Sequence, residues 1–254
     1  MSDLRSLAMT EQRPSPPPIG VARLGGAMYL IIIVLGLFAE ISVRQRLIVA
    51  NDAMATAANI RAHEFLWRCG VASELVSLMC VTVLMLTWLA VLRPVNRDLA
   101  YLAIFFSLTA HAVGAVGGLQ AFATLFPLSD ASWLQSFTPE QLSALARLTL
   151  REQSYTFAVS LFLSGCFFVI AGPLIFRSGY LPKAIGVLYT IAGVGYIVNT
   201  FALVLAPAVA DRVFMVAAPM ILIVESSLSL YLLIKGVQVE GWNRRQTQLA
   251  TEHS

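Results

Sequence analysis

Three ionisable side chains, Glu74, His111 and Glu225, lie inside long apolar stretches of this sequence, where charge is costly. A carboxylate at the centre of a lipid bilayer costs about 2.5–3.5 kcal/mol unless it is paired, protonated or faces water. In such a place carboxyl and imidazole groups can exchange protons or bind a small solute. Asn199 and Glu40 join them as candidate ligand- or proton-binding residues, because both fall in or near the same half of the predicted membrane region.

The same residues admit two other interpretations. They can hold helices in register with no ligand chemistry, or they can belong to a catalytic site. Support for catalysis is weak, because Ser164-Gly165 lacks the preceding glycine of intramembrane serine proteases, and metal spacings such as H-E-x-x-H and nucleotide-binding glycine motifs are absent. The sequence leaves open whether the protein is an enzyme, but it favours a protein without enzymatic activity. It predicts no catalytic residue, no metal site and no cofactor.

The composition of the chain predicts a membrane protein. Of its 254 residues, 58% are hydrophobic and 12% are charged, whereas soluble domains are about one quarter charged. The formal net charge of +3 is small, and no run of Lys or Arg and no nucleic-acid-binding motif occurs. We therefore expect the lipid bilayer as a partner and no nucleic acid, while protein partners stay unknown.

Six apolar runs are long enough to cross a bilayer, which takes about 20 helical residues. Backbone groups in lipid must be satisfied within their own segment, so helix is the expected form. The sequence thus predicts an all-α integral membrane bundle over 21–236, with six transmembrane helices at about 21–40, 66–92, 99–126, 154–176, 184–206 and 213–234. Residues 1–20, which contain four prolines, are predicted to form a disordered tail, and 237–254 a C-terminal tail.

The distribution of basic residues predicts the orientation of the bundle. The two tails and the two tight loops, around 93–98 and 177–183, carry ten of the 17 Lys and Arg residues. Because Lys and Arg concentrate in cytoplasmic loops, both termini are expected in the cytoplasm. The longer connections, around 51–65 and 127–152, would then lie outside.

These two longer connections contain helix-start signals. Asp52 can cap a helix through the Ala-rich sequence that follows, and Glu64 and Arg68 have the i,i+4 spacing of a helical ion pair. Thr138 and Gln141 match a capping box with proline at the first helical position. We expect a short extracytoplasmic amphipathic helix after Thr138.

Small and polar residues recur at helical spacing in several of the apolar runs. The second run carries such a stripe, made of Gly70, Ser73, Glu74, Ser77 and Cys80. Residues three or four positions apart share one face of a helix, and small residues let transmembrane helices approach closely. We expect this face to point into the bundle.

Several short motifs resemble a known bacterial family over most of the chain, from about Arg23 to Pro207. The motifs are Ala22-Arg23-Leu24-Gly25-Gly26 with Tyr29, Thr56-Ala57-Ala58-Asn59-Ile60 after Asp52, Leu92-Arg93-Pro94-Val95-Asn96-Arg97, Phe176-Arg177-Ser178-Gly179-Tyr180-Leu181-Pro182, Gly186-Val187-Leu188 and Ala192-Gly193-Val194-Gly195-Tyr196. Together they resemble the multi-pass membrane family labelled domain of unknown function 4386. The resemblance implies a protein of the bacterial inner membrane, and it carries over no activity.

Overall fold

The computed structural model describes residues 16–252, apart from the side chains at 209, 211, 213, 216, 217 and 252. Its α-helices are α2 (Ile19–Leu37), α3 (Gln45–Leu47), α4 (Ala53–Ala62), α5 (Glu64–Leu92), α6 (Arg97–Ala123), α7 (Pro139–Ser178), α8 (Lys183–Leu205), α9 (Pro207–Ile234) and α10 (Val239–Glu252). A π-helical segment, η1 (Phe38–Arg44), joins α2 to α3, and a 3₁₀ turn, η2 (Ser132–Ser136), precedes α7. No strand occurs between residues 16 and 252. Expectations for residues 1–15 and 253–254 fall outside the described part of the chain.

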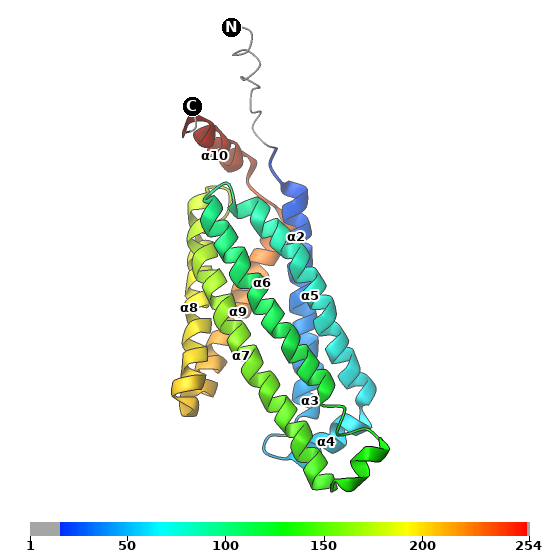
Figure 1. Cartoon of the computed structure of the whole chain (residues 1–254). Helices are drawn as coiled ribbons and strands as arrows, with labels where there is room; N and C mark the ends of the chain where they lie inside the picture. The colour runs from blue at the N-terminus through cyan, green and yellow to red at the C-terminus, as the bar shows by residue number, and fades with distance from the viewer. Residues whose placement is uncertain (1–15, 253–254) are drawn as a thin grey trace, which may run out of the picture.

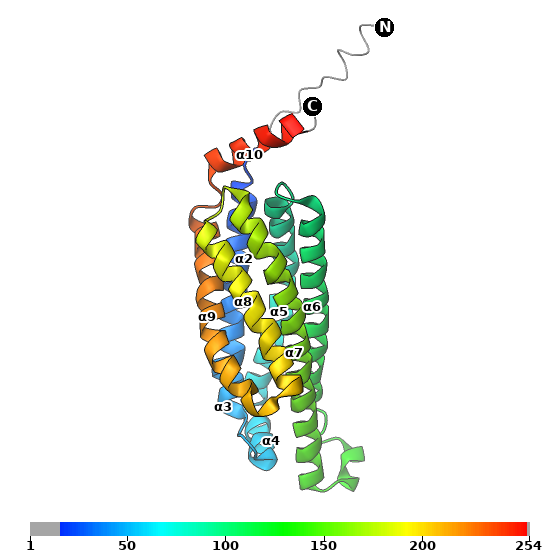
Figure 2. The ribbon, with the colours of Figure 1, turned by 90° about the vertical axis from the view of Figure 1, so that its left-hand side faces the viewer.

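Six long helices, α2 and α5 to α9, form a closed ring, and they stand side by side along the bundle (Figures 1 and 2). Each packs against the next in the order α2, α5, α6, α7, α8, α9, and α9 packs against α2 to close the ring. Helix α4 lies at one end of the bundle, here called the α4 end, whereas α10 and the start of α2 lie at the opposite, α10 end (Figure 1). Ring neighbours are therefore successive long helices of the chain, except at the α9–α2 contact, which joins its two ends.

The lengths and hydropathies of the helices fit a membrane-spanning bundle. Within residues 16–252, five helical stretches meet the requirements for crossing a bilayer: Ile19–Leu47, Glu64–Leu92, Arg97–Ala123, Pro139–Ser178 and Lys183–Leu205. A sixth candidate is the pair Ala218–Ile234 and Val239–Thr251, which is bent by 88°. Figure 2 shows that α9 runs along the ring and that α10 turns across its end. The predicted all-α membrane bundle is confirmed, with five to six candidate spans.

The first span, made of α2, η1 and α3, and helix α7 extend the furthest beyond the ranges expected from the sequence. The first span, expected over 21–40, stays helical to Leu47, and Ile48 is the first extended residue. The amphipathic segment after Thr138 is the first part of α7, which continues without a break to Ser178. Neither proline nor glycine occurs from Gln141 to Ser164, so nothing in the sequence separates the amphipathic segment from the span that follows it. Helix α7 therefore projects past its neighbours at the α4 end (Figure 2).

The predicted start signals at the α4 end are confirmed. The side chain of Asp52 accepts a hydrogen bond of 2.8 Å from the backbone N–H three residues further on. Thr138 and Gln141 form the complete capping box at the start of α7. Arg68 donates to Glu64 at 2.7 Å, which completes the predicted ion pair on α5.

Helix α10 packs across the end of the bundle, where the sequence predicts only a tail. The rings of Trp242 and Tyr180 meet edge to face with their centroids 5.0 Å apart. Arg245 donates hydrogen bonds of 3.1 and 2.9 Å to the carbonyls of Pro94 and Val95, in the α5–α6 loop. These contacts tie α10 to both tight loops.

Replacing Arg245 by alanine is expected to loosen α10. Hydrogen bonds from a charged group contribute about 1.5–3 kcal/mol, so the amides of α10 should exchange roughly tenfold faster or more in hydrogen-exchange mass spectrometry. Arg244→Ala is the matched control, because Arg244 bonds a carbonyl of its own helix, that of Glu240 at 3.4 Å. Equal exchange in both variants would contradict a clamp by Arg245.

Two apolar clusters fill the bundle and leave a more polar layer between them. The larger includes Trp88 and Tyr189 and occupies the middle and the α10 end. The smaller lies at the α4 end and includes Val43 and Trp67. Along α5, Glu74 falls midway between Trp67 of the small cluster and Val81 of the large one. The carboxylate is therefore placed where apolar packing is interrupted.

Candidate functional site

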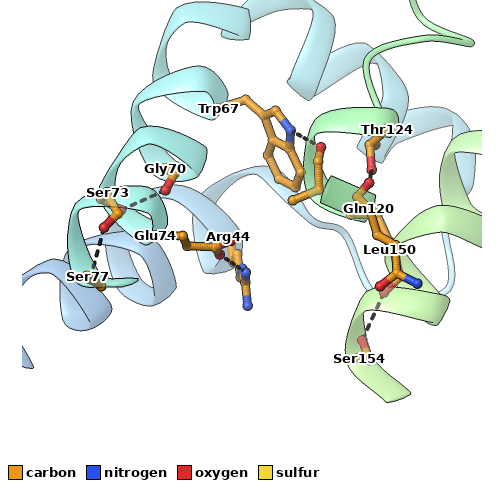
Figure 3. Close-up of polar contacts among 11 residues, drawn as sticks. Arg44, Trp67, Gly70, Ser73, Glu74, Ser77, Gln120, Thr124, Leu150 and Ser154 are labelled. Carbon is orange, nitrogen blue, oxygen red and sulfur yellow. Dashed lines mark hydrogen bonds and ion pairs between the residues drawn. The ribbon is translucent and has the colours of Figure 1, made fainter. Parts of the chain in front are cut away.

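The side chain of Glu74 forms an ion pair with Arg44 inside the bundle. Figure 3 shows the two side chains meeting between η1 and α5. They are partly buried, with 25% of the Arg44 side chain and 27% of the Glu74 side chain exposed. The guanidinium of Arg44 cannot lose its proton, so it supplies a fixed positive charge to this carboxylate.

Arg44 reaches Glu74 because the first span does not end where its apolar run ends. The helix continues through Phe38–Arg44 in π-helical form, and Arg44 is the last residue of that segment. Single π-helical turns within α-helices are rare and occur often at functional sites. On the other side, Gly70 lets Val43 approach α5, since a methyl group added at Gly70 would lie 3.1 Å from Cγ1 of Val43.

A small cavity adjoins the ion pair. Its volume is about 10 Å³, which is room for about one water molecule. The lining residues come from α2–η1, α5 and α6, and are Ala39, Val43, Arg44, Trp67, Gly70, Val71, Glu74 and Ala121. We call these residues the Glu74 site. Gly118 of α6 also faces it, because a methyl group added there would lie 3.2 Å from Oε2 of Glu74.

Hydrogen bonds hold the walls of the Glu74 site in place. The indole N–H of Trp67 donates to the carbonyl of Ala121 at 2.8 Å and joins α5 to α6 (Figure 3). At the preceding residue of α6, Oε1 of Gln120 accepts a hydrogen bond of 2.8 Å from Thr156 of α7. Among the residues that line the site, Arg44 and Glu74 are the two with ionisable side chains.

A second polar cluster surrounds Glu225 on α9. Tyr196 of α8 donates a long hydrogen bond of 3.5 Å to Oε1 of Glu225, and the hydroxyl of Tyr29 also interacts with this carboxyl group. Tyr29 and Tyr189 share a hydrogen bond of 2.9 Å between their hydroxyl groups. We call Tyr29, Tyr189, Tyr196 and Glu225 the Glu225 site.

Aromatic packing fixes the tyrosines of the Glu225 site. Phe168 stacks on Tyr189 with the ring centroids 4.1 Å apart, and it meets Tyr196 edge to face at 5.5 Å. Trp88 lies 5.7 Å from the Tyr189 ring on its other flank. Because the Tyr189 ring is packed, the hydroxyl group at its tip has little freedom to move. The hydrogen bond between Tyr29 and Tyr189 is therefore held in a fixed geometry.

His111, Asn199 and Glu40 each lie apart from these two sites or at their edge. Nδ1 of His111 is 2.7 Å from the carbonyl of Ser107, on its own helix. Asn199 is buried, and within residues 16–252 its Oδ1 has no hydrogen-bond partner. Glu40 is exposed and accepts a hydrogen bond of 3.3 Å from Gln45.

The structure separates the candidate residues instead of collecting them in one cavity. Tyr29 of α2 lies at the level of Glu225, and Ala39 lies at the level of Glu74. Tyr29 and Ala39 are about 15 Å apart along the helix axis, at 1.5 Å per residue. Along α6, His111 is seven residues from Gly118, the neighbour of Glu74, or about 10 Å. Glu74 and Glu225 therefore belong to two sites at different depths.

The sequence does not predict Arg44 or the Tyr29–Tyr189 pair as parts of a site. Arg44 was expected in an outer loop, because the apolar run ends at about residue 40. The available signal was that no proline or glycine follows Gly36 before residue 48, so the helix had no reason to stop there. The pairing of Tyr29 with Tyr189 carries no local signal, since the two residues are 160 positions apart.

The functional groups at the two sites are carboxyl, guanidinium and phenol groups, which form hydrogen bonds. Among residues 16–252, no three His, Cys, Asp or Glu side chains gather where they could bind a metal ion.

Comparison with known proteins identifies a family. Curated proteins and solved structures give no significant match. The sequence profile of a family described as domain of unknown function (DUF4386) matches residues 24–236. This match covers the ring of helices from α2 to α9 and agrees with the resemblance noted in the sequence. The chain therefore belongs to the DUF4386 family of multi-pass membrane proteins.

Proposed function

We propose that this membrane protein binds or moves a proton or a small solute at the Glu74 site, with Glu74 as the acceptor and Arg44 as its counter-ion. The observation that carries the proposal is the ion pair between η1 and α5, placed between two apolar clusters and beside a cavity. Ionisable groups inside a membrane bundle are costly and usually serve function.

Stability alone is a poor reason for such a pair. Replacing a buried ion pair by apolar side chains of similar volume is often neutral or stabilising. The bundle already holds α2 against α5 by apolar packing, through residues such as Tyr29, Ile33 and Leu84. A charge pair in the same interface is therefore better explained by a role for its charges.

The size of the cavity favours a proton over a larger solute. A space for about one water molecule admits a hydrogen-bonded water that delivers a proton to Glu74. A larger solute would first have to separate Arg44 from Glu74. A solute with a carboxylate could then replace Glu74 at the guanidinium, because Arg binds such groups through paired hydrogen bonds.

Glu225 extends this proposal deeper into the bundle. Its carboxyl group lies among three tyrosines whose hydroxyl groups donate and accept hydrogen bonds. We propose the Glu225 site as a second proton-binding position, with His111, Asn199 and Glu40 as further candidates. The bias of Lys and Arg supports an orientation with both termini in the bacterial cytoplasm, so that the Glu74 site opens outward.

A purely structural or partner-binding role is the second candidate. The Arg44–Glu74 pair joins η1 to α5 and, together with Trp67, ties that corner of the ring together. In that case the polar residues would serve helix packing, and no ligand would bind. This role predicts that charge-neutral variants change stability without changing proton flux.

Proton flux into vesicles distinguishes the two candidates. Purified protein is reconstituted into phospholipid vesicles that enclose a pH-sensitive dye, and a pH step is applied outside. The proposal predicts a faster pH change than in protein-free vesicles, slowed about tenfold or more by Glu74→Gln. Glu64→Gln is the matched control, because Glu64 forms an exposed ion pair on the same helix. Wild-type flux equal to that of protein-free vesicles would contradict proton movement.

A further inference from the structure

A hollow on the outer face of the bundle lies between α7 and α8 near the α10 end. Its volume is about 320 Å³, and it is lined by Gly172, Pro173, Phe176, Arg177, Gly186, Val187 and Thr190. Figure 2 shows α8 crossing α7 on the outside of the ring. Phe176 and Val187, which flank the hollow, are 43% and 46% exposed, so in a membrane this surface faces lipid.

Close helix packing creates the hollow. Gly172 and Gly186 stand against each other where α7 and α8 cross, and a methyl group added at Gly186 would lie 2.7 Å from the carbonyl oxygen of Gly172. With no side chains at these two positions, the surface is recessed along the line where the helices meet and is walled by larger residues. An acyl chain lying along the seam would fill this space with apolar contacts.

Two cations stand at the membrane-edge end of the hollow. Arg177 lines it directly, and the ammonium of Lys183 is 5.5 Å from the centre of the Phe176 ring, above the wall. The loop between them, 178–182, carries no acidic residue, and neither does α8. Helix α10 packs against this loop through Gly241 and Gly179. Its first acidic residue is Glu240.

We infer that the α7–α8 seam is a binding site for an anionic phospholipid. One acyl chain occupies the hollow, and the headgroup phosphate binds Arg177 and Lys183. All lipid-facing surfaces are covered by lipid, but here a hollow and two cations occur together, as in headgroup sites between transmembrane helices. Arg offers a planar pair of donors to phosphate and Lys a compact charge. This inference is independent of the proton site.

Native mass spectrometry of the intact protein tests the inference. The protein is delipidated in mild detergent and titrated with phosphatidylglycerol or with phosphatidylethanolamine of the same acyl chains. The wild type should retain phosphatidylglycerol at least tenfold more strongly. The double variant Arg177→Gln/Lys183→Gln should lose this preference, because each basic residue near a headgroup contributes several-fold to binding.

Two further variants test the position of the charges and the role of the hollow. The double variant Arg93→Gln/Arg97→Gln removes the same amount of charge at the same end of the bundle. It is a matched control, because Arg97 also lies over an aromatic ring, that of Tyr101 at 5.8 Å. The lipid preference of this variant should match that of the wild type. Val187→Trp fills the hollow at an exposed position and should weaken retention of both lipids. Unchanged binding in Val187→Trp, or equal loss in the two double variants, would overturn the site.

Discussion

Arg44→Gln is expected to lower the free energy of unfolding of the detergent-solubilised protein by about 1–3 kcal/mol. Breaking a fully buried ion pair costs about 3–5 kcal/mol because one charge stays unpaired, and exposed pairs contribute about 0–1 kcal/mol. Arg44 and Glu74 keep about a quarter of their surface exposed, which places them between these limits. Thermal unfolding followed by circular dichroism measures the loss.

The two single variants should differ in their dependence on pH. In Arg44→Gln the unpaired carboxylate of Glu74 can be neutralised by a proton, so its defect relative to the wild type should shrink as pH falls. Glu74→Gln has no carboxyl group at this position, and its guanidinium keeps its charge at every accessible pH, so this site should add no pH dependence to the variant's own free energy of unfolding. The double variant Arg44→Gln/Glu74→Gln should recover part of the loss, because neither charge remains.

An exposed ion pair provides the control for these variants. Arg68→Gln breaks the pair with Glu64, whose side chains are about half exposed, and should change the unfolding free energy by less than about 1 kcal/mol. A loss in Arg68→Gln as large as that in Arg44→Gln would mean that the position inside the bundle does not matter. The proposed site would then lose its energetic basis.

The second large effect is expected at the contact that closes the ring. A methyl group added at Gly26 of α2 would collide with the backbone N of Leu233 and lie 2.7 Å from the carbonyl oxygen of Ser229, both on α9. Ser229 also donates a hydrogen bond of 2.9 Å to the Gly26 carbonyl. Backbone atoms cannot move aside as a side chain can, so Gly26→Ala should cost about 2–3 kcal/mol.

Gly36 offers the matched control on the same helix. A methyl group added there meets no atom within 4 Å, and alanine is favoured over glycine inside helices by up to about 1 kcal/mol. Gly36→Ala should therefore be neutral or slightly stabilising in the same thermal unfolding experiment. If Gly26→Ala were also neutral, α2 and α9 would not be in the close contact described here.

The helices could be predicted because few physical rules determine them. The length of the apolar runs and the need to satisfy backbone groups in lipid predict the spans. The stripe on α5 was predicted to face inward, and Gly70, Ser73 and Cys80 are indeed buried. Local capping chemistry at Asp52 and Thr138 was equally visible.

The arrangement of the sites could not be predicted, because it depends on contacts between distant helices. Arg44 meets Glu74 only because η1 keeps the helix going and faces α5. Helix α10 has a local sequence that reads as a polar tail, and Trp242 and Arg245 hold it through contacts with both tight loops. The separation of Glu74 from Glu225 likewise depends on how α5 and α9 align with α2, since Glu74 lies at the level of Ala39 and Glu225 at that of Tyr29.

The most direct test of the proposed site asks whether Glu74 itself takes up a proton. Infrared difference spectra of the reconstituted protein between alkaline and acidic buffer report the C=O stretch of protonated carboxyl groups, and groups shielded from water absorb at the high-frequency end. We predict a high-frequency component that Glu74→Gln removes and Glu64→Gln retains. A high-frequency band that is the same in the wild type and in Glu74→Gln would contradict proton binding at Glu74.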